Sequence, residues 1–150
     1  MILLVDAGNT RLKWRLVGAD AAAPQAEGAC AHDGIDLLGD ELGRLLGASP
    51  TCGARLTRIV GTNVAGPGVA ERIARLGAGW GLVPEWITPT ASCAGVTNRY
   101  DNPAQLGADR WAALIGARRL HTGHCLVVSA GTATTVDLLM ADGCFQGRLI

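Results

Sequence analysis

The sequence predicts a mixed α/β fold that contains a duplicated unit. Apolar and alternating segments typical of β-strands open the chain, and helical segments then alternate with further strands. A strand, a glycine turn and a second strand occur twice. The 150 residues are 49% hydrophobic and 17% charged, which is enough apolar surface for a core and excludes a disordered chain.

The N-terminal segment predicts a β-hairpin. Residues 2–5 are an apolar run typical of a buried strand, and residues 6–10 contain the glycine and asparagine of a turn. Residues 11–17 then alternate between apolar and basic side chains, which predicts a half-exposed strand with Trp14 on its buried face. Residues 28–32 are a candidate third strand that would complete a meander.

The middle of the chain alternates helices and strands. Apolar residues at helical spacing predict a helix over residues 35–46, and a second helix is predicted over about residues 68–76. Short apolar segments predict buried strands at residues 56–61 and 82–87. Residues 88–94 are expected to form a polar loop.

A third helix is predicted to end near Leu120. Residues 102–105, Asn-Pro-Ala-Gln, are typical of a helix start, but Gly107 disfavours the first turns, so the start is expected nearer Ala108. Three strands follow, with a hairpin turn before the last of them, at residues 125–128, 134–140 and 144–150.

Two short segments resemble each other and indicate the duplication. Residues 5–10 read VDAGNT and residues 128–133 read VSAGTA, and each segment joins an apolar strand to an alternating strand. Much further structure follows the first copy, whereas few residues follow the second. We therefore expect one domain over residues 1–120, and the first β-meander of a truncated second domain over residues 121–150.

The first glycine turn is a candidate phosphate loop. Gly8 permits close approach of the backbone to a phosphate, and Asn9 and Thr10 add side-chain donors. Asp6, at the strand end, is placed to hold Mg²⁺ through water, and Lys13 could approach a nucleotide phosphate. A plain hairpin turn is the alternative for one such loop alone, but the matching second loop favours phosphate binding.

The second turn groups hydroxyl groups around Gly131, at Thr132, Thr134 and Thr135. Threonine is also common in strands because it is β-branched. Asp137 on the same strand either supports this loop or, as we expect, is an exposed strand residue.

A carboxylate and a guanidinium stand next to each other at the predicted start of the third helix. Asp109 would lie in the first turn, where the positive end of the helix dipole favours its ionised form. Such a carboxylate can take a proton from a substrate hydroxyl in phosphoryl transfer, and Arg110 could bind a substrate carboxylate or phosphoryl group. The alternative is ordinary helix capping beside a solvated charged pair.

The composition argues against several classes of partner. Lys and Arg together number 13, as do Asp and Glu, so the formal net charge of zero favours neither nucleic acid nor an anionic membrane. Five scattered cysteines predict neither a disulfide framework nor a zinc site, and no apolar run approaches a membrane span. We expect a cytoplasmic protein.

Three motifs, taken in order, carry a resemblance to a known family. They are LVDAGNT at residues 4–10, Tyr-x-x-Pro-x-x-Leu-Gly-x-Asp-Arg at residues 100–110, and Gly-Thr-Ala-Thr-Thr-x-Asp at residues 131–137. Together with VGTNV at residues 60–64, they resemble type III pantothenate kinase, a family of the actin-like ATPase superfamily that is related to Bvg accessory factor proteins.

The resemblance implies two actin-like, ribonuclease H-like domains, each a mixed sheet with flanking helices, on either side of a cleft. It implies a cytoplasmic homodimer that phosphorylates pantothenate with ATP, the first step of coenzyme A biosynthesis. Mg²⁺ and a monovalent cation such as K⁺ or NH₄⁺ are the implied cofactors.

The resemblance also implies roles for individual residues, with Asp109 as the catalytic base and Asp6 holding Mg²⁺ through water. The ATP-binding residues that it implies are Asp6, Ala7, Gly8, Asn9, Thr10, Arg11, Leu12, Lys13 and Thr132. The pantothenate-binding residues that it implies are Tyr100, Gly107, Ala108, Asp109 and Arg110.

The chain departs from the family pattern in two respects. Ser129 stands where the family usually has an Asp that helps to bind the monovalent cation, and a neutral hydroxyl is a poorer ligand, so K⁺ dependence is left open. Family members also extend well past Ile150. We expect the chain to be a fragment that lacks part of both substrate sites and is inactive alone.

Two alternatives remain at this point. One is another actin-like kinase for a sugar or an acid, against which Tyr100 and residues 107–110 argue. The other is a non-enzymatic accessory or regulatory protein on the same fold, which Ser129 keeps open.

Overall fold

The computed structural model describes residues 1–18, 24–47 and 55–148. The chain divides into two compact units, Met1–Ile87 and Thr88–Ile150, which are described separately. Within the described ranges, no helix combines the length and the apolar character needed to cross a membrane.

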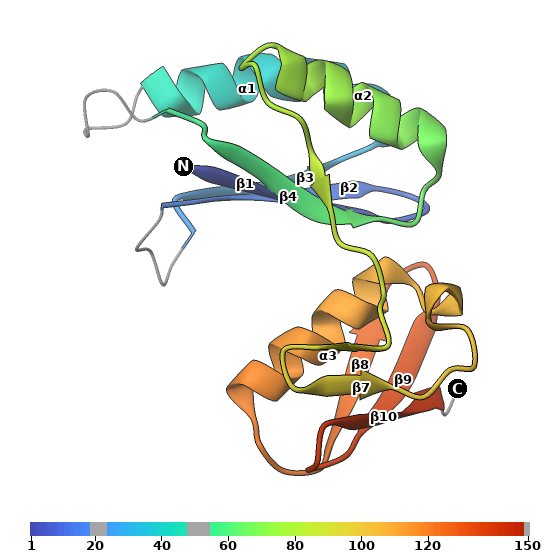
Figure 1. Ribbon diagram of the computed structural model, residues 1–150. Helices are drawn as coiled ribbons and strands as arrows, with labels where there is room; N and C mark the ends of the chain where they lie inside the picture. The colour runs from blue at the N-terminus through green and yellow to red at the C-terminus, as the bar shows by residue number, and fades with distance from the viewer. Residues whose placement is uncertain (19–23, 48–54, 149–150) are drawn as a thin grey trace. The chain divides into compact units, whose positions relative to one another are not determined.

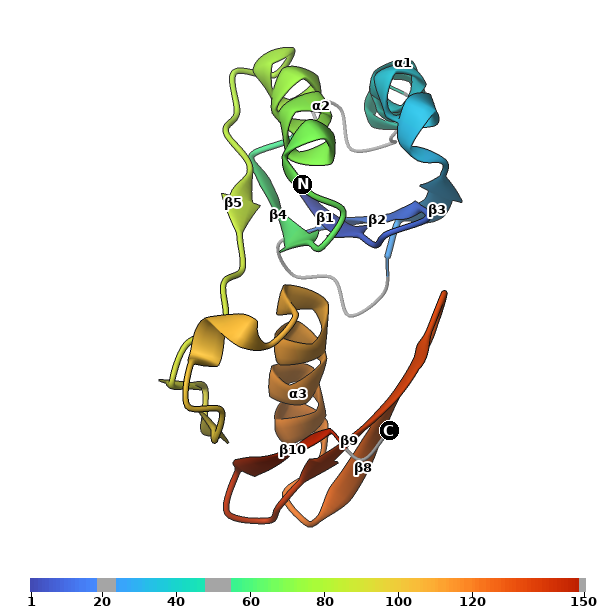
Figure 2. The ribbon, with the colours of Figure 1, turned by 90° about the vertical axis from the view of Figure 1, so that its right-hand side faces the viewer.

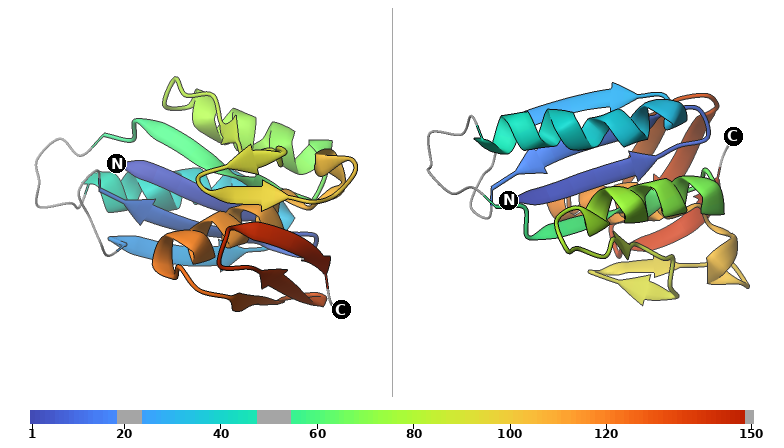
Figure 3. Two further views of the ribbon diagram at one scale, coloured as in Figure 1. Left: turned by 60° about the horizontal axis from the view of Figure 1, so that its bottom comes forward. Right: turned by 90° about the horizontal axis from the view of Figure 1, so that it is seen from above.

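The first unit is a five-stranded mixed sheet with the strand order β3-β2-β1-β4-β5. Strand β1 pairs antiparallel with β2 and parallel with β4. Helices α1 and α2 run side by side on one face of this sheet (Figures 1 and 3). The elements in chain order are β1 (Ile2–Ala7), β2 (Leu12–Val17), β3 (Ala26–Cys30), the 3₁₀ turn η1 (His32–Gly34), α1 (Ile35–Gly47), β4 (Arg58–Asn63), α2 (Pro67–Ala78) and β5 (Glu85–Trp86).

The core of the first unit lies between the sheet and the two helices. Burial alternates along β2, as predicted, and Trp14 is buried. Strand β1 alternates as well, so Leu4 and Asp6 lie on the face opposite Leu3 and Val5, whereas a strand buried on both faces was expected. Each fully buried Leu or Ile side chain stabilises the fold by about 1.5–3 kcal/mol. The buried face of β1 therefore fixes the strand in place, and Asp6 lies on the opposite face with its carboxylate outside the core.

Gly61 allows β1 and β4 to pair closely. A Cβ atom at this position would lie 2.1 Å from the carbonyl oxygen of Val5, its register partner on β1. Only glycine fits at this contact without moving the strand that carries Asp6.

The second unit is a five-stranded mixed sheet with the order β6-β7-β10-β9-β8. Helix α3 contacts β7 and β8, and Figure 2 shows it over the strands of this sheet. The meander β10-β9-β8 repeats the order β3-β2-β1 of the first unit, as the duplicated sequence predicts. The elements are β6 (Ser92–Cys93), β7 (Val96–Asn98), the 3₁₀ turn η2 (Pro103–Gln105), α3 (Ala108–Leu120), β8 (Cys125–Ala130), β9 (Thr134–Leu139) and β10 (Cys144–Arg148).

The helix-start pattern at residues 102–105 caps a 3₁₀ turn and not the helix itself. The Asn102 side chain accepts a hydrogen bond from the backbone N–H of Ala104, and α3 begins only at Ala108, as the position of Gly107 predicts. The segment at residues 88–94, expected to be a loop, contains β6. The two compact units divide after Ile87. The domain boundary expected at residue 120 concerns the duplicated unit in the sequence and stays a prediction.

Candidate functional site

The first glycine turn is a short connection between paired strands. Ala7 and Leu12 are register partners, and the backbone N–H of Gly8 donates to the carbonyl of Arg11 at 3.1 Å. The carbonyl oxygen of Gly8 lies 2.9 Å from Nε2 of His32, which follows β3. Residues 9–11, the polar residues at the tip of the turn, are exposed. The turn is thus held from inside while its tip stays open to a ligand.

Asp6 is oriented by one neighbour and remains accessible. Its Oδ1 accepts a hydrogen bond of 2.9 Å from the Thr62 hydroxyl on β4, and its Oδ2 lies 3.8 Å from Nζ of Lys13. The side chains of Asp6 and Lys13 are 44% and 64% exposed, so this ion pair is weak and easily rearranged. A half-exposed carboxylate with one fixed oxygen fits a water-mediated Mg²⁺ ligand, and an exposed Lys side chain fits a phosphate contact.

The turn after β4 is built by Asn63. Its side-chain amide donates to the Gly66 carbonyl, and its Oδ1 accepts from the backbone N–H of Ala65, both at 2.9 Å. The residue types of 62–67 predict a turn that leads into the second helix, and the structure confirms that turn. No sequence pattern gives a role to the side chains of Thr62 and His32, because their partners lie far away in the sequence.

Asp109 lies in the first turn of α3, as predicted. Gly107 has an extended backbone at the N-cap, and its carbonyl accepts from the backbone N–H of Trp111 at 3.0 Å. The Asp109 carboxylate accepts a 2.8 Å hydrogen bond from the backbone N–H of Arg110, and the residue is half-buried. A fixed carboxylate that still reaches solvent can act as a proton acceptor.

The Arg110 side chain is paired inside the second unit. Its Nε donates to Oδ2 of Asp137 at 3.0 Å, and its Nη2 donates to Oδ1. The guanidinium carbon lies 5.7 Å from the centre of the Phe145 ring, and the Tyr100 ring lies 5.5 Å from that ring. Hydrogen bonding to Asp137, the largest cause, and to Tyr100 raises the pKa of Arg110 above its ordinary value against the opposing effect of burial.

Two expectations about this pair were wrong. Asp137, expected to be exposed, has no exposed surface, and the side chain of Arg110 is only 13% exposed and does not belong to a solvated face. The alternation of β9 places Asp137 on the same face as buried Leu139. A charge can occupy that position because the guanidinium neutralises it.

The second glycine turn joins β8 to β9, and the Gly131 N–H donates to the Ala133 carbonyl at 3.2 Å. Gly131 and Thr132 are exposed. Ser129 faces Thr135 across the hairpin, and the Thr135 Oγ1 is buried and has no hydrogen-bond partner among the described residues. Across residues 1–18, 24–47 and 55–148, no group of three or more His, Cys, Asp and Glu side chains could hold a metal ion.

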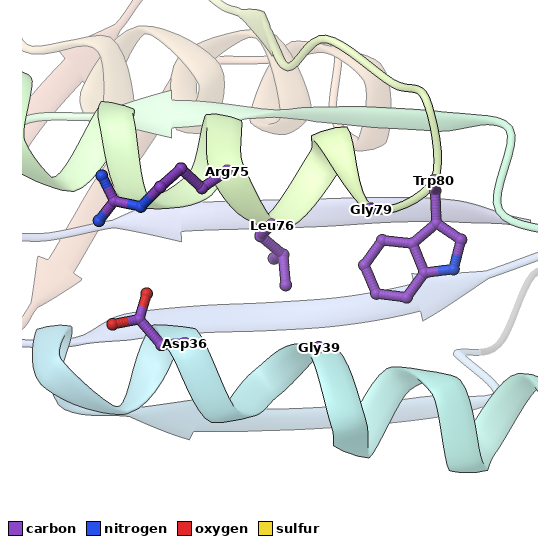
Figure 4. A pocket seen from close by; sticks show the side chains of 6 residues that line it. All are labelled: Asp36, Gly39, Arg75, Leu76, Gly79 and Trp80. Carbon is purple, nitrogen blue, oxygen red and sulfur yellow. The ribbon is translucent and has the colours of Figure 1, made fainter.

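A separate pocket of about 460 Å³ lies between α1 and α2 (Figure 4). The residues that line it are Asp36, Gly39, Arg75, Leu76, Gly79 and Trp80. Asp36 also forms a 2.7 Å ion pair with Arg72. The pocket contains none of the residues that the motifs single out, so we interpret it as the seam between two packed helices.

Comparison with known proteins gives three consistent findings. The family model described as type III pantothenate kinase matches residues 2–150. A type III pantothenate kinase of Aromatoleum aromaticum is 55% identical over 150 residues, which are 100% of this chain and 58% of that protein. One of Azoarcus sp. (strain BH72) is 51% identical over 100% of this chain and 54% of its own length.

The fold is similar to that of a solved protein of low sequence identity. The crystal structure of the ethanolamine utilization protein EutJ from Carboxydothermus hydrogenoformans matches with a TM-score of 0.53 at 18% identity. The match covers 98% of this chain and 50% of that one, and it shows the fold alone. The chain spans about half the length of the curated relatives that it matches.

Proposed function

The chain belongs to the type III pantothenate kinase family, and we propose on that basis that the full-length protein phosphorylates pantothenate with ATP. The product would be 4′-phosphopantothenate, and the reaction would be the first step of coenzyme A biosynthesis. The match over residues 2–150 is the observation that carries this proposal. The names of the relatives favour it over another actin-like kinase and over a non-enzymatic accessory protein.

The proposed chemistry assigns proton transfer to Asp109. The pantothenate hydroxyl oxygen attacks the γ-phosphorus of ATP, its proton passes to the Asp109 carboxylate, and the bond from the γ-phosphorus to the bridging oxygen breaks to release ADP. The position of Asp109 in the first turn of α3, fixed by the Arg110 N–H, supports this role. The proposed pantothenate contacts are Tyr100, Gly107, Ala108, Asp109 and Arg110.

ATP binding is assigned to the two glycine turns, through residues 6–13 and Thr132. Mg²⁺ supplies charge neutralisation on the β- and γ-phosphates when bound. Asp6 would hold it through water, since its carboxylate is oriented by Thr62 and remains half-exposed.

We further propose that the protein is a cytoplasmic homodimer, as the family resemblance implies.

We also propose that the protein needs a monovalent cation only weakly. Ser129 replaces the family's usual Asp, so the donors that this chain offers to K⁺ or NH₄⁺ at that position are the hydroxyls of Ser129 and Thr135. The Oγ1 of Thr135, which is buried and has no hydrogen-bond partner among the described residues, supports an oxygen ligand there, but neutral oxygens bind a cation less tightly than a carboxylate.

The test is pantothenate-dependent ADP release by the full-length protein, followed in a coupled assay. The Asp109→Asn variant should lose at least about 100-fold in kcat, because general-base catalysis contributes roughly that much. Asp40→Asn, an exposed change on α1, is the matched control and should retain the wild-type kcat. A folded wild-type protein that releases no ADP with pantothenate would refute the proposal.

Residues 1–150 alone should show no turnover, because they span about half the length of the relatives. Measurable phosphorylation of pantothenate by this chain would contradict that expectation.

A further inference from the structure

We propose that Asp137 is a positioning residue: its carboxylate fixes the orientation of the Arg110 guanidinium, and so determines which N–H groups Arg110 offers to pantothenate. The inference rests on the proposed function, in which Arg110 contacts that substrate. It goes beyond the family motif, since the motif places Asp137 in the sequence without giving it a task.

The burial of Asp137 is the first observation. It has no exposed surface, and among the described residues it is the only Asp, Glu, His, Lys or Arg that is buried. Placing a carboxylate in such an environment costs several kcal/mol unless a matched partner satisfies it. A buried pair is therefore weak as a device for stability, and replacing it with apolar residues is often neutral or stabilising.

The geometry of the pair fixes the guanidinium plane. Two parallel N–H groups of Arg110, on Nε and Nη2, donate to the two oxygens of Asp137. A bidentate pair of this kind sets both position and orientation, which a lysine could not reproduce. The Phe145 ring lies against the guanidinium, 5.7 Å from its central carbon.

The bond to Asp137 determines which N–H groups of Arg110 are left to bind other groups. A guanidinium has about five N–H groups, and two of them are used by Asp137, so the Nη1 pair and the second Nη2 proton are left for Tyr100 and a substrate. One Nη1 proton and one Nη2 proton lie side by side on the outer edge of the group and suit a carboxylate or phosphoryl oxygen of a substrate. Without Asp137, the side chain could rotate and present a different edge.

Helix α3 has an anchor besides this pair. Trp111 and Leu114 are 1% and 0% exposed, and they hold the helix by apolar burial. The pair lies instead at the first turn of α3, next to Asp109, the proposed base. Asp137 thus acts where the substrate motif is, and we infer that its task is orientation and not fold stability.

The experiment compares Asp137→Asn and Asp137→Glu with wild type in the full-length protein, measuring KM for pantothenate, KM for ATP and the urea unfolding midpoint. The Glu variant keeps the charge and shifts the guanidinium. Both variants should raise the pantothenate KM at least about 10-fold, with the ATP KM within about twofold. Asp142→Asn, an exposed change at the turn before β10, is the control and should leave both constants unchanged.

A double-mutant cycle separates orientation from structure. If Asp137 acts through Arg110, then Asp137→Asn should add less than about threefold to the pantothenate KM of an Arg110→Lys protein. A merely structural residue would lower the unfolding midpoint in both backgrounds and would leave the pantothenate KM of the folded fraction at the wild-type value.

Each outcome is decisive. An active wild type with folded Asp137 variants of unchanged pantothenate KM overturns the inference but leaves the proposed function intact. A folded wild type that does not act on pantothenate overturns the proposed function and the inference with it. If neither variant folds, the pair serves folding, and the inference is wrong.

Discussion

The hydroxyl group of Thr62 donates a 2.9 Å hydrogen bond to the carboxylate of Asp6 across the parallel strands β4 and β1. Thr62 is 6% exposed, whereas the side chain of Asp6 is 44% exposed. A buried donor on one strand therefore aims an accessible carboxylate on the next. This contact joins the strand after the first helix to the first glycine turn.

Replacement of Thr62 by Val should raise the KM for MgATP about 3- to 10-fold, because Asp6 loses the donor that orients it. The variant keeps the side-chain shape and should lose about 1 kcal/mol of unfolding free energy. The checks are steady-state kinetics and urea unfolding of the full-length protein. Thr88→Val, an exposed control, should change neither value, and an unchanged KM in Thr62→Val would remove Thr62 from the site.

His32 should support ATP binding through the backbone of the first turn. Its Nε2 lies 2.9 Å from the Gly8 carbonyl, so His32→Ala releases the turn from inside. We expect a several-fold rise in the KM for ATP with little change in the pantothenate KM. The exposed His121→Ala is the control, and equal ATP affinities in the two variants, measured by calorimetry, would speak against this role.

Gly61→Ala should destabilise the first unit strongly. The new Cβ would lie 2.1 Å from the Val5 carbonyl oxygen, and a backbone atom in a paired strand cannot move aside cheaply. We expect a loss of about 3 kcal/mol or more of unfolding free energy. Gly68→Ala, whose Cβ meets no atom of the described residues within 4 Å, should be close to neutral, and urea unfolding of both variants compares them.

The Arg58–Glu85 ion pair predicts a pH-dependent contribution to stability at the β4–β5 edge. Its hydrogen bonds, 2.7 and 2.8 Å long, lower the pKa of Glu85 below its ordinary value of 4.5. The contribution is therefore present above that ordinary value and is lost as the pH falls through the lower folded pKa. Unfolding of wild type and Glu85→Gln from pH 7 to pH 2 should show a small difference that disappears in acid. A difference that grows in acid would show the opposite linkage.

Local patterns predicted much of the fold. The alternation in β2 identified its buried face, and Gly107 placed the start of α3 at Ala108. The hairpin of β6 and β7 was missed because its turn uses Ala94 and Gly95 at φ values of 49° and 80°. Such turns usually carry Asn-Gly or Asp-Gly, and alanine at a positive φ gives no sequence signal.

The candidate site was predictable where the motif is contiguous and not where it depends on distant contacts. Asp6 and Asp109 follow from their positions at a strand end and a helix start. The burial of Asp137 depends on Arg110, which is 27 residues away on a helix that packs over the sheet. Period-two alternation allowed either face for Asp137, and a charge made the exposed one the natural expectation.

The most direct test of the proposed kinase activity is ³¹P nuclear magnetic resonance of a reaction that contains the full-length protein, pantothenate and MgATP. A pantothenate kinase with Asp109 as its base gives one new phosphomonoester signal that grows in step with ADP and is lost in Asp109→Asn. ATP consumption that yields only inorganic phosphate, or a phosphomonoester that forms equally fast in Asp109→Asn, would contradict it.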